Sequence, residues 1–147
     1  MPSLTLLFID DDNSLQVLAK AILSGQLFNV LTATSVKEAE KVLQAHHVDL
    51  IICDVMMPEE DGITFCARLR KGGNKVPMLI LSAVGDPQVI ARGLESGASD
   101  YLVKPFDIFQ LQQRILNMIG QKPRATAAKT PPARSTSVPK FLGWFRR

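Results

Sequence analysis

Leu4-Thr5-Leu6-Leu7-Phe8-Ile9-Asp10-Asp11 (residues 4–11) is an almost unbroken apolar run that ends in two carboxylates. A short run of this composition is typical of a central strand of a parallel sheet, which is buried on both faces. Three further apolar runs end in Asp54, in Ser82 and in Lys104-Pro105. Because groups just beyond the carboxyl ends of parallel strands share one crevice, the pattern predicts that these polar side chains converge.

The same alternation of apolar runs and amphipathic stretches continues through the first 120 residues, which is the form of a repeated βα unit. The capping pair Ser35 and Glu38 and the helix-starting Pro87 mark the beginnings of two helices, and glycines mark helix ends, with the fourth helix expected to end at Gly97 and the fifth at Gly120. The sequence therefore predicts an α/β fold with five helices and a five-stranded parallel sheet. The strands are expected at residues 4–9, 28–33, 49–53, 77–82 and 100–103.

Length and composition limit the possible classes of protein. The chain of 147 residues can form one domain with a sizeable core and an appendage. It contains no run of 18 apolar residues, and its start lacks the basic character of a secretory signal, so a cytoplasmic location is expected. Cys53 and Cys66 match neither a disulfide framework nor a zinc-site spacing, and we expect both to be small core residues.

The net charge of +3 conceals a division along the chain. Residues 1–120 carry all 14 acidic residues and 10 of the 17 Lys and Arg, whereas residues 121–147 carry the other seven basic residues and no acid. The first part is therefore net acidic and the second strongly basic. This distribution argues against a nucleic-acid-binding face on the folded domain.

Asp10 and Asp11 are candidates for binding a divalent cation. An acid at the turn after a strand often caps the following helix, but one residue is enough for that, and Asp12 or Asn13 is better placed. Asp10 and Asp11 then remain for a hard cation such as Mg²⁺, which prefers a few carboxylates together with water and phosphate oxygens. The acids would repel one another without such a cation.

Asp54, Ser82 and Lys104 are candidates for phosphoryl transfer. A carboxylate at the end of a buried strand beside a cation can act as a nucleophile and form an acyl phosphate. A hydroxyl and an ammonium group can bind the oxygens of the transferred group. Taken one at a time, Asp54 could simply start a turn, Ser82 could end a strand and Lys104 could be a surface residue. Pro105 holds the residue before it extended, which favours a Lys104 side chain that points inward.

Four segments of the chain form a recognisable set: Ile9-Asp10-Asp11-Asp12, Asp54-Val55-Met56-Met57-Pro58 with Asp61-Gly62, Leu81-Ser82-Ala83, and Gly97-Ala98-Ser99-Asp100-Tyr101-Leu102-Val103-Lys104-Pro105-Phe106. Together they resemble the receiver domain of bacterial two-component response regulators, of the stand-alone chemotaxis type. The resemblance covers residues 4–119 and implies a flavodoxin-like, doubly wound sheet with strand order 2-1-3-4-5. Ser82 replaces the commoner Thr and retains its hydroxyl.

The resemblance implies roles for individual residues. Asp54 would accept a phosphoryl group from a histidine kinase or a histidine phosphotransfer protein, and Ser82 and Lys104 would contact the phosphoryl oxygens. Mg²⁺ would be held by Asp11, Asp54 and the Met56 carbonyl, with Asp10 assisting through water. On phosphorylation Ser82 would turn inward and Tyr101 would follow, which would remodel the face formed by the fourth helix, the fifth strand and the fifth helix.

Other functions remain open at this point. Asp10-Asp11-Asp12-Asn13-Ser14 superficially resembles the nucleophile loop of haloacid-dehalogenase-type phosphatases, but that assignment would leave Asp54 unused. A receiver would catalyse only its own Mg²⁺-dependent phosphorylation and dephosphorylation and would not otherwise be an enzyme. No DNA-binding or other output domain follows residue 120, so signalling to an unknown partner protein, service as a phosphorelay intermediate and service as a phosphate sink are all considered.

The remaining residues predict two further segments after a receiver domain at residues 1–120. Prolines, Ala, Ser, Thr and single basic residues make up 121–139, which we expect to be a flexible linker. Residues 140–147 combine three basic residues with an aromatic cluster, Phe141, Trp144 and Phe145, which would share one side of a helix formed on docking. This segment is expected to dock a protein groove or an anionic membrane, although a merely disordered end is the alternative.

Overall fold

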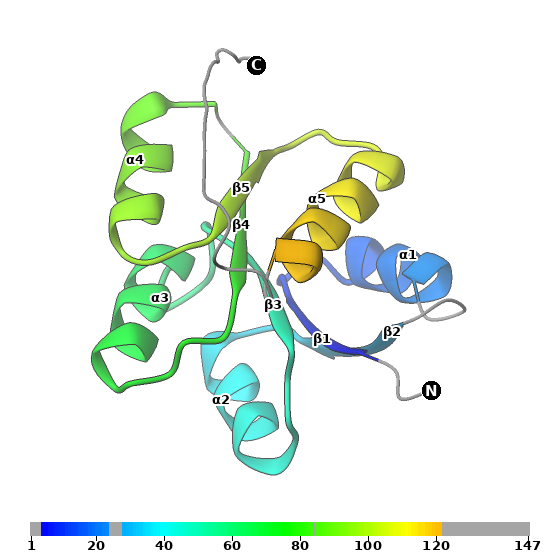
Figure 1. Ribbon diagram of the computed structural model, residues 1–147, viewed down its shortest axis with the longest axis horizontal. Helices are drawn as coiled ribbons and strands as arrows, with labels where there is room; N and C mark the ends of the chain where they lie inside the picture. The colour runs from blue at the N-terminus through cyan, green and yellow to red at the C-terminus, as the bar shows by residue number, and fades with distance from the viewer. Residues whose placement is uncertain (1–3, 24–27, 84, 122–147) are drawn as a thin grey trace. The chain divides into compact units, whose positions relative to one another are not determined.

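The computed structural model of the chain describes residues 4–23, 28–83 and 85–121. Strands and helices alternate throughout this part, as the sequence predicts (Figure 1). Their bounds are β1 Leu4–Ile9, α1 Asn13–Leu23, β2 Phe28–Ala33, α2 Val36–Ala45, β3 Leu50–Asp54, α3 Gly62–Lys71, β4 Met78–Ser82, α4 Pro87–Glu95, β5 Asp100–Val103 and α5 Ile108–Gln121.

The five strands form one parallel sheet in the order β2-β1-β3-β4-β5. The chain moves from β1 to one edge of the sheet and then crosses to the other side of β1, so the strand order reverses between β1 and β3. The carboxyl ends of β1 and β3 therefore flank the position at which ligands bind in open α/β sheets. This topology confirms the flavodoxin-like, doubly wound fold.

The three central strands form the core of the sheet. Leu6, Leu7, Phe8 and Ile9 of β1 have no exposed surface, and every residue of β3 and β4 is buried. Figure 1 shows α1 and the first turns of α5 on one side of the sheet, with α2, α3 and α4 on the other. Helices on both faces explain why these strands are continuously apolar instead of alternating.

Side-chain caps start the helices where the sequence predicts. Ser35 accepts a hydrogen bond from the Glu38 amide at 3.1 Å, and Pro87 begins α4. Two helix ends differ from expectation, since α4 stops at Glu95, before the predicted Gly97, and α5 continues past Gly120. Gly97 lies beyond the cap of α4 with a φ of 112°, a left-handed conformation that only glycine adopts readily.

Several expectations concern features outside the strands. Cys53 and Cys66 are free and buried, as predicted. Among the described residues, no helix is long and apolar enough to cross a membrane. The predicted linker at 121–139, apart from Gln121, and the predicted docking segment at 140–147 with Phe141, Trp144 and Phe145 lie outside the described residues.

Candidate functional site

Three carboxylates meet at the carboxyl ends of β1 and β3. Asp10 directly follows β1 and Asp54 ends β3, and the two strands are neighbours with Ile9 opposite Cys53. One oxygen from each of Asp10, Asp11 and Asp54 lies within 4.8 Å of the others. Asp10 and Asp54 are buried and Asp11 is exposed, so the cluster opens to solvent on one side.

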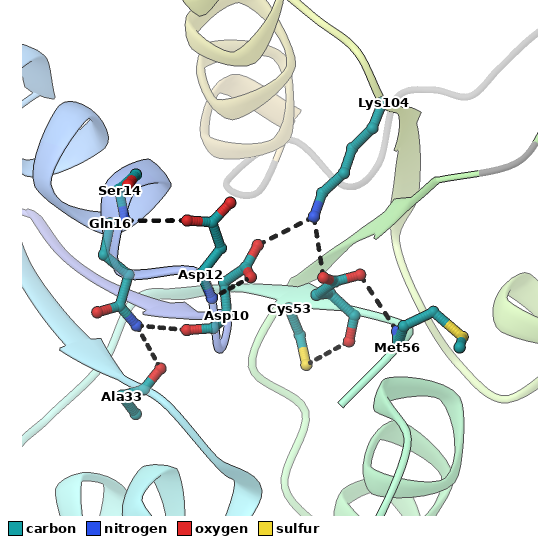
Figure 2. Close-up of polar contacts among 9 residues, drawn as sticks. Asp10, Asp12, Ser14, Gln16, Ala33, Cys53, Met56 and Lys104 are labelled. Carbon is teal, nitrogen blue, oxygen red and sulfur yellow. Dashed lines mark hydrogen bonds and ion pairs between the residues drawn. The ribbon is translucent and has the colours of Figure 1, made fainter. Parts of the chain in front are cut away.

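Lys104 spans the two buried carboxylates, as Figure 2 shows. Its Nζ lies 3.1 Å from Oδ2 of Asp10 and 2.9 Å from Oδ2 of Asp54. Lys104 directly follows β5, which is separated from β3 by β4, so its long side chain reaches across the end of a whole strand. The Lys104–Pro105 peptide bond is cis.

Burial and pairing shift the protonation of the site. Burial raises the pKa of Asp10, and the nearby Asp54 charge raises it further, while hydrogen bonds from the Asp12 amide and Lys104 offset only part of the effect. Burial alone would lower the pKa of Lys104, but its hydrogen bonds to Asp54 and Asp10 prevail and raise the pKa. Lys104 therefore stays protonated between Asp10 and Asp54. Its single positive charge does not neutralise the three carboxylates of the cluster.

Backbone amides fix the carboxylate oxygens that Lys104 does not bind. Oδ1 of Asp10 accepts from the Asp12 amide at 2.9 Å, and Oδ1 of Asp54 accepts from the Met56 amide at 3.2 Å. Asp12 itself accepts from the Ser14 amide at 2.9 Å, at the start of α1. Asp12 thus has the local capping contact expected from the sequence, which leaves Asp10 and Asp11 for the cluster.

The donor set of the cluster suits a hard divalent cation. All three candidate ligands are carboxylates, and oxygen ligands are those that Mg²⁺ prefers. Softer metals favour imidazole or thiolate ligands. Cys53, the nearest thiol along the chain, is fully buried; burial raises its pKa far above the usual range, and the neighbouring carboxylates raise it further. The residues present therefore fit Mg²⁺.

Ser82 and Tyr101 lie against the same pocket. Ser82 ends β4 and is 4% exposed, while Tyr101 belongs to β5 and is half-buried. Arg114 of α5 holds the backbone and ring of Tyr101, since its Nη1 donates to the Tyr101 carbonyl at 3.1 Å and its Cζ lies 5.8 Å from the ring centroid. The pocket lies between α4 and strands β4 and β5 and is lined by Ile80, Ser82, Val89, Ile90, Gly93, Leu94, Ala98, Asp100 and Tyr101.

Two residues have structural roles at the site that the sequence analysis did not predict. A Cβ atom on Gly62 would lie 2.4 Å from the Asp54 carbonyl oxygen, so α3 can start close to Asp54 only because residue 62 is glycine. Gln16, on α1, is 7% exposed and binds backbone carbonyls beside the acidic cluster. The Asp61-Gly62 pair in the sequence could have indicated the role of Gly62, whereas no sequence pattern indicated a role for Gln16.

Comparison with protein families gives one assignment that covers most of the chain. Residues 6–116 match the family described as "Response regulator receiver domain". Two curated relatives, both named "Probable transcriptional regulator ycf27", come from Cyanophora paradoxa and Cyanidium caldarium. The first is 37% identical over 85% of this chain and 52% of its own length, and the second is 39% identical over 78% and 45%. The chain spans about half the length of these relatives.

A solved structure of a receiver domain is similar to this chain in both sequence and fold. The receiver domain of the Francisella response regulator 1452 is 33% identical to this chain and superposes with a TM-score of 0.76. The similarity covers 83% of this chain and all of that domain. The sequence match and the superposition therefore indicate the same family.

Proposed function

The chain belongs to the response regulator receiver domain family, and from this premise we propose that it is a signalling switch that accepts a phosphoryl group on Asp54. The observation that carries the proposal is the position of the Asp54 carboxylate. It ends a central strand, is 5% exposed, lies within the acidic cluster and pairs with Lys104 at 2.9 Å. A nucleophile needs this combination of restricted solvent and nearby positive charge.

The proposed cofactor is Mg²⁺. Asp11, Asp54 and the carbonyl of Met56 would hold it, and Asp10 would assist through water. When bound, Mg²⁺ would neutralise negative charge at the point where a phosphoryl group approaches carboxylates. The Met56 amide donates to Asp54, so the backbone that carries this carbonyl is already tied to the phosphoacceptor.

Phosphoryl transfer would use residues already in place. An Asp54 oxygen would attack the phosphorus of a phosphohistidine, forming a P–O bond as the P–N bond breaks, and the released imidazole would take up a proton. Lys104 would move its hydrogen bonds from the carboxylates to a phosphoryl oxygen. The Ser82 hydroxyl would donate to another phosphoryl oxygen, because Ser82 ends the strand adjacent to β3.

The signal would leave the site through Ser82 and Tyr101. Both line the pocket between α4 and strands β4 and β5, so an inward turn of Ser82 opens room that the Tyr101 ring can follow into. Movement of Tyr101 would change the contacts of Arg114 on α5. The proposed output surface is therefore the face formed by α4, β5 and α5. A phosphoryl group can increase the population of the active conformation only through contacts that differ between the active and inactive conformations.

The proposed phosphodonor is a histidine kinase or a histidine phosphotransfer protein. Two exposed apolar side chains support docking of a protein beside the acidic cluster. Val17 is 68% exposed one turn into α1, and Met56 is 70% exposed just after Asp54. A proposed cytoplasmic location would suit such a donor.

Two outputs are considered for the phosphorylated chain. In the first, the α4-β5-α5 face binds a downstream partner protein. In the second, the chain is a phosphorelay intermediate or a phosphate sink, and the phosphoryl group passes onward or is lost without partner binding. Phosphoryl transfer from Asp54 to a second histidine phosphotransfer protein would support a relay, and phosphorylation-dependent partner binding would support a switch.

An enzymatic role beyond the chain's own phosphorylation and dephosphorylation is not proposed. A haloacid-dehalogenase-type phosphatase would use the loop at Asp10 to Ser14 and would leave Asp54 without a role. Asp54 instead shares the cluster with Asp10 and Asp11 and shares Lys104 with Asp10. This geometry favours the receiver mechanism.

The test is phosphorylation of the purified chain by acetyl phosphate with Mg²⁺, followed by intact-mass measurement. We expect one added phosphoryl group on the parent chain and none on Asp54→Asn. The control is Asp107→Asn, since Asp107 is an exposed cap of α5 and Asn caps a helix equally well. Phosphorylation of Asp54→Asn at the parent rate would refute Asp54 as the phosphoacceptor.

A further inference from the structure

Gln16 places a buried side-chain amide beside the acidic cluster. The residue lies on α1 and is 7% exposed, although glutamine is mostly a surface residue. Its Nε2 donates two short hydrogen bonds, to the Asp10 carbonyl at 2.7 Å and to the Ala33 carbonyl at 2.6 Å (Figure 2). The amide therefore ties α1 to the ends of two strands at once.

The ladder between β1 and β2 stops at the level of these two carbonyls. The Asp10 amide makes the last backbone bond of the ladder, to the Ala33 carbonyl at 3.1 Å. Gln16 Nε2 donates to the Asp10 carbonyl where the ladder ends, and it adds a second donor to the Ala33 carbonyl. Buried carbonyls are nearly always hydrogen-bonded, so Gln16 satisfies the backbone at this point.

This contact fixes the backbone that carries two of the three acids. Asp10 is held at its carbonyl by Gln16 and at its carboxylate by the Asp12 amide and Lys104. Asp11 is exposed, so the course of the backbone between Asp10 and Asp12 determines where its carboxylate lies. A shift of this backbone by a fraction of an ångström would separate Asp11 and Asp10 from Asp54, which is carried by a different strand.

We propose that Gln16 is a positioning residue for the divalent-cation site, acting through the backbone of Asp10 and Asp11. The proposal shares one assumption with the proposed function, namely that the acidic cluster binds Mg²⁺. Outer contacts that orient metal ligands commonly change metal affinity about 10–100-fold when removed. The role of Gln16 therefore predicts a specific loss of Mg²⁺ affinity, whereas a purely structural role predicts loss of stability alone.

The principal experiment compares Mg²⁺ affinity in matched variants by titration calorimetry on the full chain with Mg²⁺ alone. Gln16→Met retains the length and bulk of the side chain and removes both donors. Gln113→Met makes the same change at an exposed position of α5, and Val48→Ala destabilises the core at the opposite, amino-terminal end of β3. We expect about tenfold weaker Mg²⁺ binding in Gln16→Met and parent affinity in both controls.

Two outcomes would overturn the assignment in this experiment. The first is a Gln16→Met variant that binds Mg²⁺ within twofold of the parent affinity. The second is a Val48→Ala variant that loses as much thermal stability as Gln16→Met and also loses as much Mg²⁺ affinity. Phosphorylation by acetyl phosphate at saturating Mg²⁺ should remain near the parent rate in Gln16→Met, since Asp54 and Lys104 are unchanged. The loss should therefore lie in the Mg²⁺ dependence and not in the maximal rate.

A second measurement uses the unsubstituted chain, in case Gln16→Met does not fold. In nuclear magnetic resonance spectra, the two Nε2 protons of Gln16 should exchange slowly with solvent, and their signals should shift when Mg²⁺ is added. Rapid exchange, or signals that do not respond to Mg²⁺ while those of Asp11 and Met56 do, would overturn the proposal. These readouts require no phosphorylation, so a chain that binds Mg²⁺ but cannot be phosphorylated would refute the proposed function and leave the role of Gln16 testable.

Discussion

Lys104 and Asp54 form an ion pair that joins the ends of two non-adjacent strands, with Nζ and Oδ2 separated by 2.9 Å. The Asp54 side chain is 7% exposed and that of Lys104 is 23% exposed. The same ammonium group also binds Asp10 at 3.1 Å. One side chain that directly follows β5 thus holds together the carboxylates at the ends of β1 and β3, and this arrangement leads to the first prediction.

Replacing Lys104 with Met should destabilise the metal-free protein, because two buried carboxylates lose their cationic partner. Breaking a fully buried pair costs roughly 3–5 kcal/mol. Since Lys104 keeps some solvent contact, we expect a loss of about 2 kcal/mol in the free energy of unfolding. Urea denaturation would measure it, with Lys20→Met on exposed α1 surface as control. The loss should shrink in excess Mg²⁺; equal stability of Lys104→Met and Lys20→Met without metal would contradict the prediction.

The pH dependence of metal-free stability should reveal the raised pKa of Asp10. Burial raises this pKa above its ordinary value of 3.8, so ionisation of Asp10 disfavours the folded state. The penalty is absent below pH 3.8 and develops as the pH rises through the raised value. Asp10→Asn removes the ionisable group, and its melting temperature relative to the parent should increase between about pH 4 and pH 7. A difference that stays flat or falls over this range would show that Asp10 ionises without penalty.

Gly62→Ala should disturb the end of β3. The added Cβ would meet the Asp54 carbonyl oxygen at 2.4 Å, and a backbone atom cannot rotate away as a flexible side chain can. We expect a loss of about 2–3 kcal/mol in unfolding free energy and slower phosphorylation of Asp54. At Gly72 the nearest atom to an added Cβ is 3.5 Å away, so Gly72→Ala should change stability by less than about 0.5 kcal/mol. Similar values for both variants in urea denaturation would be inconsistent with this close contact.

Ser82→Ala should separate phosphorylation from its readout. Asp54 remains in place, so the phosphoryl mimic beryllofluoride should still bind, but the differential contact that moves Tyr101 is lost. Amide spectra should show that shifts in α4 and α5 fall to less than roughly half of those in the parent. Ser82→Thr keeps the hydroxyl and should retain them. Parent-sized shifts in Ser82→Ala would exclude Ser82 from the switch.

Residues 140–147 should contribute to docking but not to the chemistry of Asp54. A flexible tether at 121–139 would have a root-mean-square span on the order of 25 Å, which would keep the receiver near a target bound by the tail. Replacing 140–147 with a Gly-Ser segment of equal length should leave phosphorylation unchanged and weaken association with a partner or with anionic vesicles. Trp144→Ala should reproduce most of that loss, since buried aromatic anchors commonly dominate such contacts.

The fluorescence of Trp144 distinguishes the two docking modes. A salt-sensitive blue shift on addition of anionic vesicles would indicate the membrane, whereas partner capture together with no blue shift on addition of vesicles would indicate a protein. If the Gly-Ser replacement captures the same partners as the parent at equal strength and neither chain binds vesicles, the segment has no docking role.

Local sequence patterns were sufficient for the strands and for the two helix starts marked by Ser35 and Pro87. The observed strand bounds differ from the predicted ones by at most one residue, because burial on both faces demands short continuous apolar runs. The predicted α4 end was two residues too long. A terminal glycine marks the region in which a helix stops, but the stopping residue depends on which amides reach the last carbonyls, and Ser96 donates there before Gly97.

The sequence by itself determined that Asp10, Asp11 and Asp54 would meet, because each acid follows a buried strand and the ends of parallel strands share one edge. Only the tertiary structure decided that Lys104 bridges two of these acids and that Gly62 must lack a Cβ beside Asp54. It also decided that Gln16 donates to backbone carbonyls at the ends of two strands. The physical reason is distance. Apolar periodicity is a local property that can be read along the chain, whereas a polar side chain acquires its partner only when packing brings remote segments within the roughly 3 Å reach of a hydrogen bond.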